Sequence, residues 1–235
     1  MFSYKFDWAI ITTGQYAGWI LDGIKTTIQL SAVSSVLAFF LGLLIAVMRM
    51  SNFSPFRWFA HGYLEFFRNT PLLVQLFFWY FGSFQVLPKV ANDWLNTVNF
   101  EFAAAVISLS IYTSAFIAED IRSGVRSIPK EQMEASRSAG FSYFGSMRYI
   151  ILPQAVRITI PPLINQFLNL TKNSSLAMTI GVAELTYQAR QVESYTFKGF
   201  EAFTAATLVY VAMSVVITAL VTLYSKKVLN PMRTH

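Results

Sequence analysis

Long apolar runs separated by short polar segments dominate the chain. A hydrocarbon core of about 30 Å takes roughly 20 helical residues to cross, and five runs reach or approach this length. They cover residues 24–48, 72–86 with an extension back to about residue 60, 102–118, 158–182 and 202–224. The pattern predicts an all-α fold, that of an integral membrane protein with five transmembrane helices.

The first 23 residues follow a different pattern. Their apolar run, 9–11, is too short to cross a membrane, and Asp7 and Asp22 bracket it. This arrangement favours an interfacial stretch rather than a further span. No basic region precedes the run and no small-residue cleavage site follows it, so we do not expect a cleaved signal peptide.

The composition excludes several other classes of protein. Charged residues make up 13% of the chain, whereas soluble domains carry roughly 25%. The chain has no Cys and only two His, His61 and His235, so we expect neither a metal site nor a cysteine-based or multi-histidine catalytic site. A net charge of +6 would suit a nucleic-acid ligand in a soluble protein. Here the basic residues lie between apolar runs, which is typical of cytoplasmic loops, so we expect membrane lipid and no nucleic acid as a partner.

Lys and Arg are distributed unevenly between alternate segments. One set of segments carries eleven of them and the other carries five. The first set is Arg49, Arg57, Arg122, Arg126, Lys130, Arg137, Arg148, Arg157, Lys226, Lys227 and Arg233, and the second is Lys5, Lys25, Lys89, Arg190 and Lys198. Because cytoplasmic segments are enriched in basic residues, we expect an extracytoplasmic N-terminal segment 1–23, a transmembrane domain 24–225 and a cytoplasmic tail 226–235.

The basic segment 122–156 carries ordered helix signals. Pro129 suits an early helical position, and Gly140 suits the position after a helix end, where φ is positive. Ser142 can cap a second short helix, which should end before Pro153. We therefore expect a compact helix-turn-helix just outside the bilayer rather than an irregular charged connector.

A recognisable motif occupies the centre of this segment. Glu134-Ala135-Ser136, followed by Gly140 and by Ile151-Leu152-Pro153, resembles the EAA motif of ABC importer permeases. That pattern is E-A-A, a Gly a few residues later and then I-x-L-P. Ser136 replaces the second Ala here, and the last part reads I-I-L-P. The resemblance implies a role in ATPase coupling for Glu134, Ala135, Gly140, Leu152 and Pro153.

Three further stretches extend the resemblance over nearly the whole chain. Residues 67–75, F-R-N-T-P-L-L-V-Q, and 172–177, K-N-S-S-L-A, are similar to signatures of the polar amino acid subfamily of these permeases. Residues 23–31 resemble the start of the first core span of the family. The nearest resemblance is to glutamate/aspartate-type permeases. It implies the type I ABC importer permease fold and import of polar amino acids, glutamate/aspartate favoured, across the bacterial cytoplasmic (inner) membrane.

The resemblance also implies partners. These are two ATP-binding subunits, a second permease that is identical or paralogous, and an extracytoplasmic solute-binding protein. The chain has no Gly-Lys dipeptide and hence no Walker A loop. We therefore expect no enzyme activity and no cofactor in this chain, with ATP and Mg²⁺ used by the partner ATPase. The alternative is a self-sufficient secondary transporter or channel for small polar solutes, which leaves the motif of 134–153 unexplained.

Polar residues form a stripe in the fourth predicted span. At 100° per residue they fall within an arc of roughly 120°. They are Asn165, Gln166, Asn169, Lys172 and Asn173. A Lys facing lipid near the bilayer centre costs about 2.5–3.5 kcal/mol on insertion scales, so the stripe should face the protein or a watery cavity. Either it lines the substrate path, with Lys172 attracting a carboxylate, or it packs helices together, with Lys172 paired to an acid such as Glu65.

A second polar group precedes Pro71 in the second predicted span. One hypothesis is that Pro71 breaks the helix and that Arg68, Asn69 and Thr70 line the substrate path. The other is a local ion pair between Glu65 and Arg68, which are three residues apart and can meet on one helix face.

Overall fold

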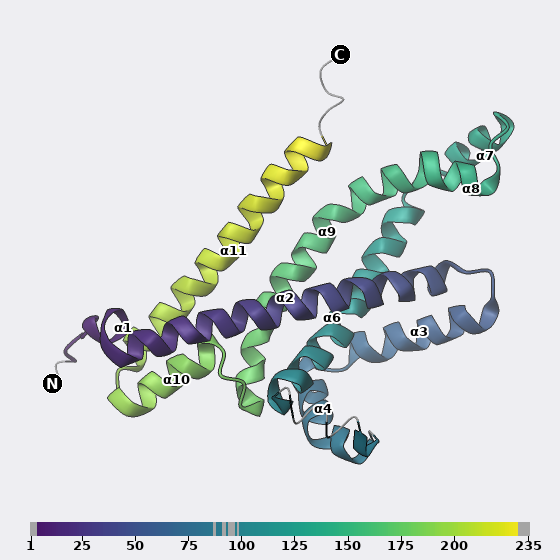
Figure 1. Ribbon diagram of the computed structural model, residues 1–235. Coiled ribbons are helices and arrows are strands. Elements are labelled where there is room, and N and C mark those ends of the chain that lie inside the picture. Colours follow the sequence, from purple (N-terminus) through teal and green to yellow (C-terminus); the bar gives the residue numbers. More distant parts are fainter. Residues whose placement is uncertain (1–3, 87, 91–92, 94–96, 98, 230–235) are drawn as a thin grey trace. The chain divides into compact units, whose positions relative to one another are not determined.

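The computed structural model describes residues 4–86, 88–90, 93, 97 and 99–229, and these form helices and connecting turns without a strand (Figure 1). The all-α fold expected from the sequence is confirmed. The helices are α1 (Ala9–Thr12), α2 (Gly14–Met50), α3 (Ser54–Asn69), α4 (Leu72–Val86), α6 (Phe100–Arg126), α7 (Lys130–Ser138), α8 (Tyr143–Ser146), the π-helix η1 (Met147–Ile151), α9 (Leu152–Asn173), the 3-10 helix η2 (Ser174–Ile180), α10 (Leu185–Thr196) and α11 (Gly199–Leu229).

Three of the described helices are long and apolar enough to cross a membrane. They are Gly14–Met50, Phe100–Arg126 and the part Gly199–Leu223 of α11. A shorter apolar stretch, Leu72–Gly82, lies in α4, and α9 carries the polar stripe. Five spans therefore stay a prediction. The helix α2 begins ten residues before the predicted start at residue 24. The division into 1–23, 24–225 and 226–235 also stays a prediction, and residues 1–3 and 230–235 lie outside the described part.

The second predicted span is not one continuous helix. The helix α3 ends at Asn69, and α4 begins at Leu72. Thr70 between them is extended, with φ −104° and ψ 136°. A residue before proline avoids the helical region because its backbone clashes with the proline ring. The extension of this span back to residue 60 is therefore wrong, whereas the break at Pro71 is confirmed.

The fourth predicted span consists of two kinds of helix. The α-helical part ends at Asn173, and the 3-10 helix η2 continues to Ile180, where Gly181 follows with φ +90°. Pro161 and Pro162 lie well inside α9 rather than at its start. Each removes one backbone donor from the helix.

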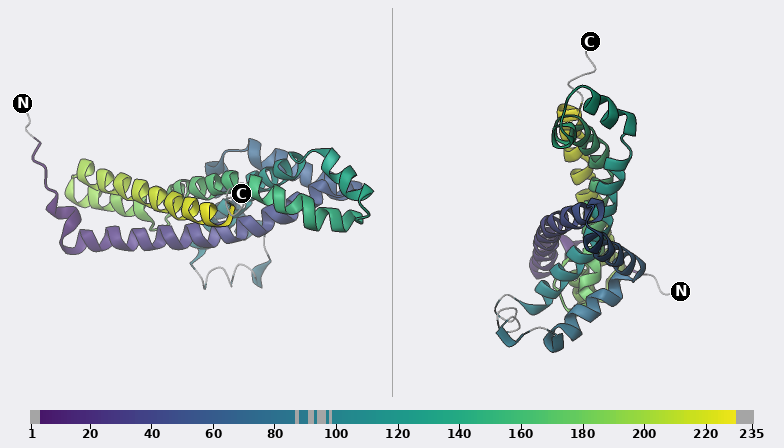
Figure 2. Two further views of the ribbon diagram at one scale, coloured as in Figure 1. Left: turned by 90° about the horizontal axis from the view of Figure 1, so that it is seen from above. Right: turned by 90° about the vertical axis from the view of Figure 1, so that its right-hand side faces the viewer.

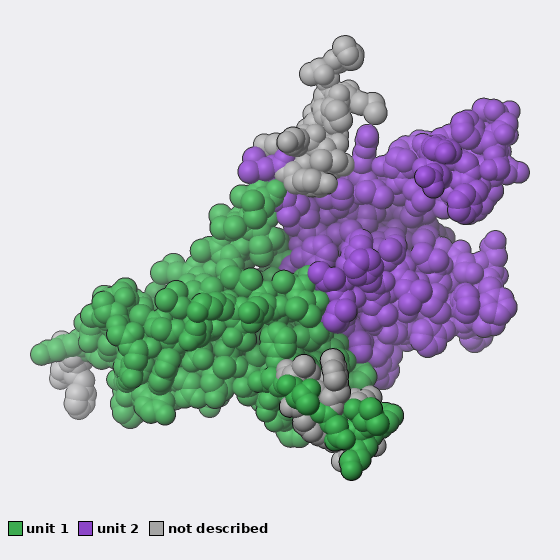
Figure 3. Space-filling view, viewed as in Figure 1, with its two compact units in different colours: residues 1–35, 71–109, 168–220 green, residues 36–70, 110–167, 221–235 purple. Residues whose placement is uncertain are grey.

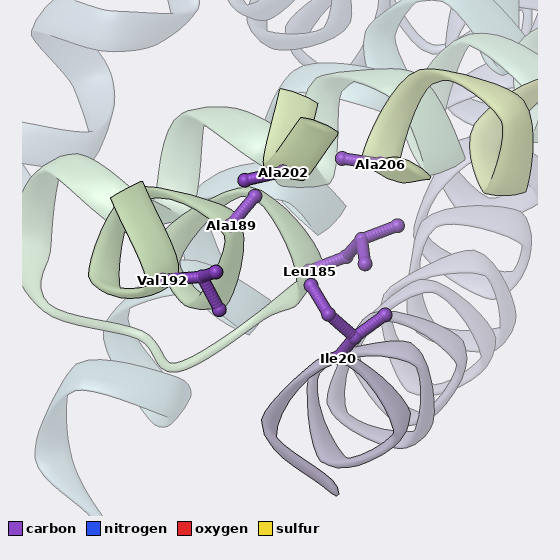
Figure 4. Close-up of a cluster of buried hydrophobic side chains, with 6 residues drawn as sticks. All are labelled: Ile20, Leu185, Ala189, Val192, Ala202 and Ala206. Carbon is purple, nitrogen blue, oxygen red and sulfur yellow. The ribbon is translucent and has the colours of Figure 1, made fainter. Parts of the chain in front are cut away.

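The chain folds into two compact units, which Figure 3 distinguishes by colour. Unit 1 comprises Met1–Ser35, Pro71–Leu109 and Leu168–Leu220, and unit 2 comprises Val36–Thr70, Ser110–Phe167 and Val221–His235. In unit 1, α10 and the start of α11 lie beside the N-terminal part of α2 (Figure 2). Their buried side chains are Ile20, Leu185, Ala189, Val192, Ala202 and Ala206 (Figure 4).

Small residues allow the helices of both units to approach closely. A Cβ on Gly23 would lie 2.8 Å from the Leu185 Cα in unit 1, so only glycine fits there. In unit 2, a Cβ on Gly42 would lie 2.6 Å from the Ile117 Cγ2. The core of unit 2 joins α2, α3 and α6 through Ile45, Ala46, Ala60, Leu64, Ala115 and Ala118. These contacts fix the helices that carry the polar sites of each unit.

Candidate functional site

The end of α7 has the geometry predicted for Gly140. Its φ is +90°, a conformation that glycine adopts without a steric cost. The Gly140 N–H donates to the Arg137 carbonyl at 3.1 Å, and the Phe141 N–H donates to the Ser136 carbonyl at 3.1 Å. This pair of hydrogen bonds is a Schellman motif, which satisfies the last carbonyls of the helix. The prediction of a positive φ at Gly140 is confirmed.

The start of the next helix also follows the sequence signal, but its end does not. The Ser142 hydroxyl accepts from the Gly145 N–H at 3.1 Å and caps α8. A helical end before Pro153 is wrong, because α8 continues through η1 into α9. Pro153 is the second residue of α9 and lies two positions after the end of the π-helical turn at Ile151. Pro153 has no N–H to donate, and the π-helical turn before it interrupts the regular hydrogen-bond pattern of the helix at that point.

A small core holds α7 against the start of α9. Ile128, Ile151 and Ala155 are buried there, and Val125 and Met133 pack against them. The Gln154 amide donates to the Gln132 side-chain oxygen at 2.6 Å and to the Ile150 carbonyl at 2.8 Å. The corner from α7 to α9, which we call the α7–α8 corner, is therefore braced by tertiary contacts. Sequence reasoning missed Gln132 and Gln154, because nothing local marks two distant amides as partners.

All five predicted coupling residues are exposed, whereas Ser136 beside them is buried. Those exposed on the α7–α8 corner or at the start of α9 are Glu134, Ala135, Gly140, Leu152 and Pro153. Ser136, the departure from the E-A-A pattern, is buried, and its hydroxyl donates to the Met133 carbonyl at 2.8 Å. A small side chain is therefore required at position 136 for packing, while the exposed residues are available to a partner.

Lys172 borders an open pocket of about 420 Å³ in unit 1. The pocket is lined by Lys172, Ser175, Thr207, Tyr210, Val211, Ser214 and Val215. One cation and several hydroxyl groups thus face a space of small-molecule size. Among the described residues of unit 1, Lys172 forms no ion pair, whereas Lys25 pairs with Asp22 at 2.9 Å. The Lys172 ammonium can bind a carboxylate by charge, whereas the Ser175 and Thr207 hydroxyls already donate to the carbonyls of Lys172 and Phe203.

A buried carboxylate supports one wall of this pocket. Glu184 is fully buried, and it accepts from the Tyr187 N–H at 2.8 Å and from the Tyr210 hydroxyl at 2.7 Å. Tyr210 also lies 3.1 Å from the Thr186 hydroxyl. Burial raises the pKa of the Glu184 carboxyl above its ordinary value. Sequence reasoning missed Glu184, although an acidic residue directly before a helix is a capping signal.

The polar stripe on α9 has mixed surroundings. Asn165, Asn169 and Lys172 are exposed and share one helix face at spacings of four and three residues. Gln166 instead donates to the Asp120 carboxylate at 2.9 Å, a contact between α9 and α6. Asn173 is half-buried. Gln166 therefore matches the packing hypothesis, while the three exposed residues remain available for the substrate path.

The residues before Pro71 have local partners in unit 2. The Asn69 amide donates to the Glu65 carbonyl at 2.7 Å and to its carboxylate at 3.1 Å, and the Thr70 hydroxyl donates to the Phe66 carbonyl at 2.9 Å. These bonds satisfy carbonyls at the end of α3.

Arg68 does not form the ion pair that its spacing suggested. Among the described residues of unit 2, the Glu65 carboxylate lies 3.9 Å from the His61 Nδ1 and forms no ion pair with Arg68. The Arg68 guanidinium lies 5.5 Å from the centre of the Phe116 ring, an arrangement that stabilises a cation. A Glu65–Arg68 pair is therefore wrong, and Arg68 stays an exposed cation. No group of three or more acidic or histidine residues suited to a metal ion occurs in the described ranges.

The chain is similar in sequence and in structure to known membrane transport proteins. The family model described as "Binding-protein-dependent transport system inner membrane component" matches residues 38–230. The probable glutamine ABC transporter permease protein GlnM of Bacillus subtilis is 45% identical over 195 residues, 83% of this chain and 86% of that protein. The glutamate/aspartate import permease protein GltJ of Escherichia coli is 34% identical over 92% of this chain and 89% of its own length. The crystal structure of an amino acid ABC transporter with histidines superposes with a TM-score of 0.84 at 32% identity, over 96% of this chain and 100% of that one.

Proposed function

Because the chain belongs to the family of binding-protein-dependent transport system inner membrane components, we propose that the α7–α8 corner and the Lys172 pocket are its ATPase-coupling and substrate-path sites. The chain is a permease subunit of an ABC importer for polar amino acids, and it is a multi-pass protein of the inner membrane. It is not itself an enzyme, because a separate ATPase partner hydrolyses ATP. A self-sufficient transporter or channel is set aside, since the matched relatives are ABC transporter permeases.

The α7–α8 corner supports the coupling proposal through its rigidity and exposure. Glu134 and Ala135 are exposed on a helix whose end is fixed by Gly140 and whose inner face packs on Ile151. A partner that binds α7 can therefore displace the start of α9 with it, because the two are joined by a common core. Leu152 and Pro153 lie at that start and would move with the corner.

The single observation that carries the substrate-path proposal is the setting of Lys172. Its side chain is exposed, lines a pocket of about 420 Å³ and shares a helix face with Asn165 and Asn169. Every α-amino acid carries a carboxylate that this cation can bind. We propose that Arg68, Asn69, Thr70 and Asn173 also line the substrate path, whereas Gln166, the fifth residue predicted there, packs α9 on α6 through Asp120.

The proposed substrate is glutamate or aspartate, with glutamine as the alternative. Lys172 borders the pocket and supplies a cation for a carboxylate. The 34% identity to a glutamate/aspartate permease supports an acidic side chain on the substrate. Because the chain is similar to both a glutamine permease and a glutamate/aspartate permease, glutamine is the alternative substrate.

The proposed assembly contains two permeases, identical or paralogous, and two ATP-binding subunits that use ATP and Mg²⁺. An extracytoplasmic solute-binding protein delivers the amino acid. The excess of Lys and Arg around the α7–α8 corner supports a cytoplasmic position for that corner, an N-terminus outside and a C-terminus in the cytoplasm.

Lys172→Gln in the reconstituted complete transporter tests the substrate path. The change removes the charge and keeps hydrogen bonding. Hydrogen bonds to a charged group contribute about 1.5–3 kcal/mol, so glutamate uptake should fall by about tenfold or more, while assembly and basal ATPase activity persist. Lys25→Gln is the matched control, because Lys25 is an exposed lysine of the same unit that is paired with Asp22.

Two other results would reject this reading. Loss of yield or thermal stability would indicate that Lys172 is a structural partner of a buried acid. Full uptake at unchanged stability would exclude both roles.

A competition experiment distinguishes the candidate substrates: excess aspartate should inhibit glutamate uptake and excess glutamine should not. Equal inhibition by glutamine would make the acidic preference wrong and leave the permease function standing.

A further inference from the structure

A cleft in unit 2 adjoins the α7–α8 corner; of the proposed coupling residues it contains only Leu152, and it contains no residue of the Lys172 pocket. It has a volume of about 550 Å³ and separates the C-terminal end of α2 from the segment α8–η1. It is lined by Val47, Met50, Ser51, Asn52, Tyr143, Phe144, Met147, Arg148 and Leu152. Neither the exposed coupling residues of α7 nor the polar stripe of α9 contributes to it. The cleft therefore requires a separate explanation.

The lining combines an apolar wall with a polar, cationic end. Val47, Met50 and Met147 supply aliphatic surface. Arg148 is exposed, its guanidinium lies 5.8 Å from the centre of the Tyr149 ring, and no described carboxylate forms an ion pair with it. The Ser51 hydroxyl accepts from the Phe53 N–H at 3.1 Å, so its own proton is free to donate. The charge and the donors suit an anionic group, and the apolar wall suits a hydrocarbon chain.

The position of the cleft along the chain is the second observation. Val47 belongs to the last turn of a long apolar helix, and Ser51 and Asn52 follow its end. The lining thus passes from a predicted membrane span to the polar segment beyond it. Arg49 and Arg57 near the same helix end add positive charge. Basic pockets at this depth attract anionic headgroups.

The π-helical turn gives the cleft its other wall. Met147 and Arg148 belong to η1, where the wider turn of a π-helix interrupts the α-helical pattern. Such turns are uncommon and occur frequently at functional sites. The turn also accommodates the approach to Pro153, but that role does not account for an unpaired arginine on the cleft side.

We propose that this cleft binds one anionic phospholipid, whose phosphate lies at Arg148, Ser51 and Asn52 and whose acyl chain covers Val47 and Met50. A docking face for the ATPase is the competing explanation. It fits less well because part of the lining belongs to a membrane span, which a soluble ATPase does not reach. The lipid would fix the end of α2 to the α8–η1 segment, next to the α7–α8 corner.

Lipid retention by the assembled transporter tests the proposal. The complex is exchanged from nanodiscs containing phosphatidylglycerol into detergent, and bound lipid is measured by native mass spectrometry. Arg148→Gln should retain at least about tenfold less phosphatidylglycerol than the parent, the effect of losing one charged contact. Arg148→Lys should retain most of it. Arg126→Gln, an exposed arginine outside the cleft lining, is the matched control and should retain as much as the parent.

A second measurement does not depend on removing Arg148. The chain has no native Cys, so a single Asn52→Cys variant reports on the cleft. A soluble thiol reagent should label it more slowly in phosphatidylglycerol nanodiscs than in phosphatidylcholine nanodiscs. Labelling of a Ser138→Cys control should be the same in both. Millimolar inorganic phosphate added to phosphatidylcholine nanodiscs should not protect Asn52→Cys.

Four outcomes would overturn the proposal. The first is equal phosphatidylglycerol retention by the parent and Arg148→Gln. The second is dissociation of the ATPase from Arg148→Gln, which would make the cleft a protein interface. The third is protection by inorganic phosphate alone, which would make it an anion site without lipid. The fourth is labelling of Asn52→Cys that is independent of the lipid. None of these outcomes bears on amino acid uptake through the Lys172 pocket, so the proposed function is tested separately.

Discussion

Two corners of the molecule turn through a left-handed residue, and they are stabilised in different ways. The α7–α8 corner uses Gly140, with φ +90°, and the corner between α10 and α11 uses Phe197, with φ +57°. Glycine adopts this conformation without strain, whereas an ordinary residue incurs about 1–2 kcal/mol. The Phe197 ring is 83% exposed, so its own packing does not offset that strain.

The contacts that hold the α10–α11 corner come from the distant N-terminal segment. Glu201, which is buried, accepts from the Tyr4 hydroxyl and from the Asp7 N–H at 2.8 Å. The Lys198 ammonium donates to the Lys5 carbonyl and lies 4.7 Å from the centre of the Tyr4 ring. The α7–α8 corner is thus specified by its own sequence, and the α10–α11 corner by contacts almost two hundred residues apart. The difference teaches that a left-handed turn can persist without glycine when tertiary contacts determine it.

Thiol labelling should show the largest difference between the two corners, because an impermeant reagent either reaches a cysteine or does not. If the two corners lie on opposite sides of the membrane, a membrane-impermeant thiol reagent should label Ser194→Cys in intact cells and should not label Ser138→Cys. Both positions are exposed. The native chain has no Cys, so the background is clean. Labelling of Ser138→Cys alone would invert the proposed topology. Position 3, a further candidate for this test, lies outside the described residues.

Gly140→Leu should disrupt the α7–α8 corner. Leucine at φ +90° costs about 1–2 kcal/mol, and a shift of that size changes an equilibrium by roughly 5- to 30-fold. Membrane insertion should persist, while the ATPase dissociates or uncouples and substrate uptake falls by a similar factor. The measurements are uptake in vesicles and co-purification of the ATPase.

Two further glycine variants sharpen this test. Gly140→Asn should retain most of the uptake, because asparagine tolerates the left-handed region. Gly62→Leu is the control, since Gly62 is exposed on α3 with open space around it and has no positive φ. Normal uptake by Gly140→Leu would show that the turn does not serve coupling.

Glu201→Ala should destabilise the corner between α10 and α11. It removes the acceptor of the Tyr4 hydroxyl and of the Asp7 N–H. Loss of these two hydrogen bonds should lower the Tm by a few degrees in a chain of this size. Tyr4→Phe removes one of the two bonds and should have the smaller effect. Thermal unfolding in detergent measures both, and an unchanged Tm for Glu201→Ala would contradict the idea that the N-terminal segment supports the corner.

Phe197→Asn gives the smallest effect and the most direct comparison with Gly140. Asparagine should relieve about 1 kcal/mol of backbone strain and raise the Tm by roughly 2–4 °C. Phe197→Ala removes the same exposed ring but keeps the strain, so it should not raise the Tm. An equal rise for both variants would assign the effect to the ring rather than to the backbone.

Sequence reasoning succeeded where one short segment contains the whole signal. Gly140 and Ser142 are local capping residues, and both have the predicted geometry. It failed where an outcome depends on what surrounds the segment. Pro153 was expected to end a helix, but the helix continues past it, after a π-helical turn that interrupts the regular hydrogen-bond pattern. The extension of the second span from residue 72 back to residue 60 was wrong, whereas the alternative that Pro71 breaks the helix was right, because proline restricts Thr70 before it.

Long-range pairs were beyond the sequence. The bond between Glu184 and Tyr210 and the brace between Gln132 and Gln154 join residues more than 20 positions apart. No spacing rule marks such partners, because the fold decides which helix faces meet. Likewise, the stripe on α9 was recognised as one group, but only the structure separates Gln166, bonded to Asp120, from the exposed Lys172.

The two prolines inside α9 have a mechanical consequence. Pro161 and Pro162 lack the N–H groups that would bond to the carbonyls of Arg157 and Ile158, so two successive rungs of the helical ladder are missing. Bending stiffness in a helix comes from that ladder, and it is therefore lowest at this point. We therefore expect a bend at Pro161 and Pro162 to cost less free energy than a bend elsewhere in α9, because fewer hydrogen bonds oppose it.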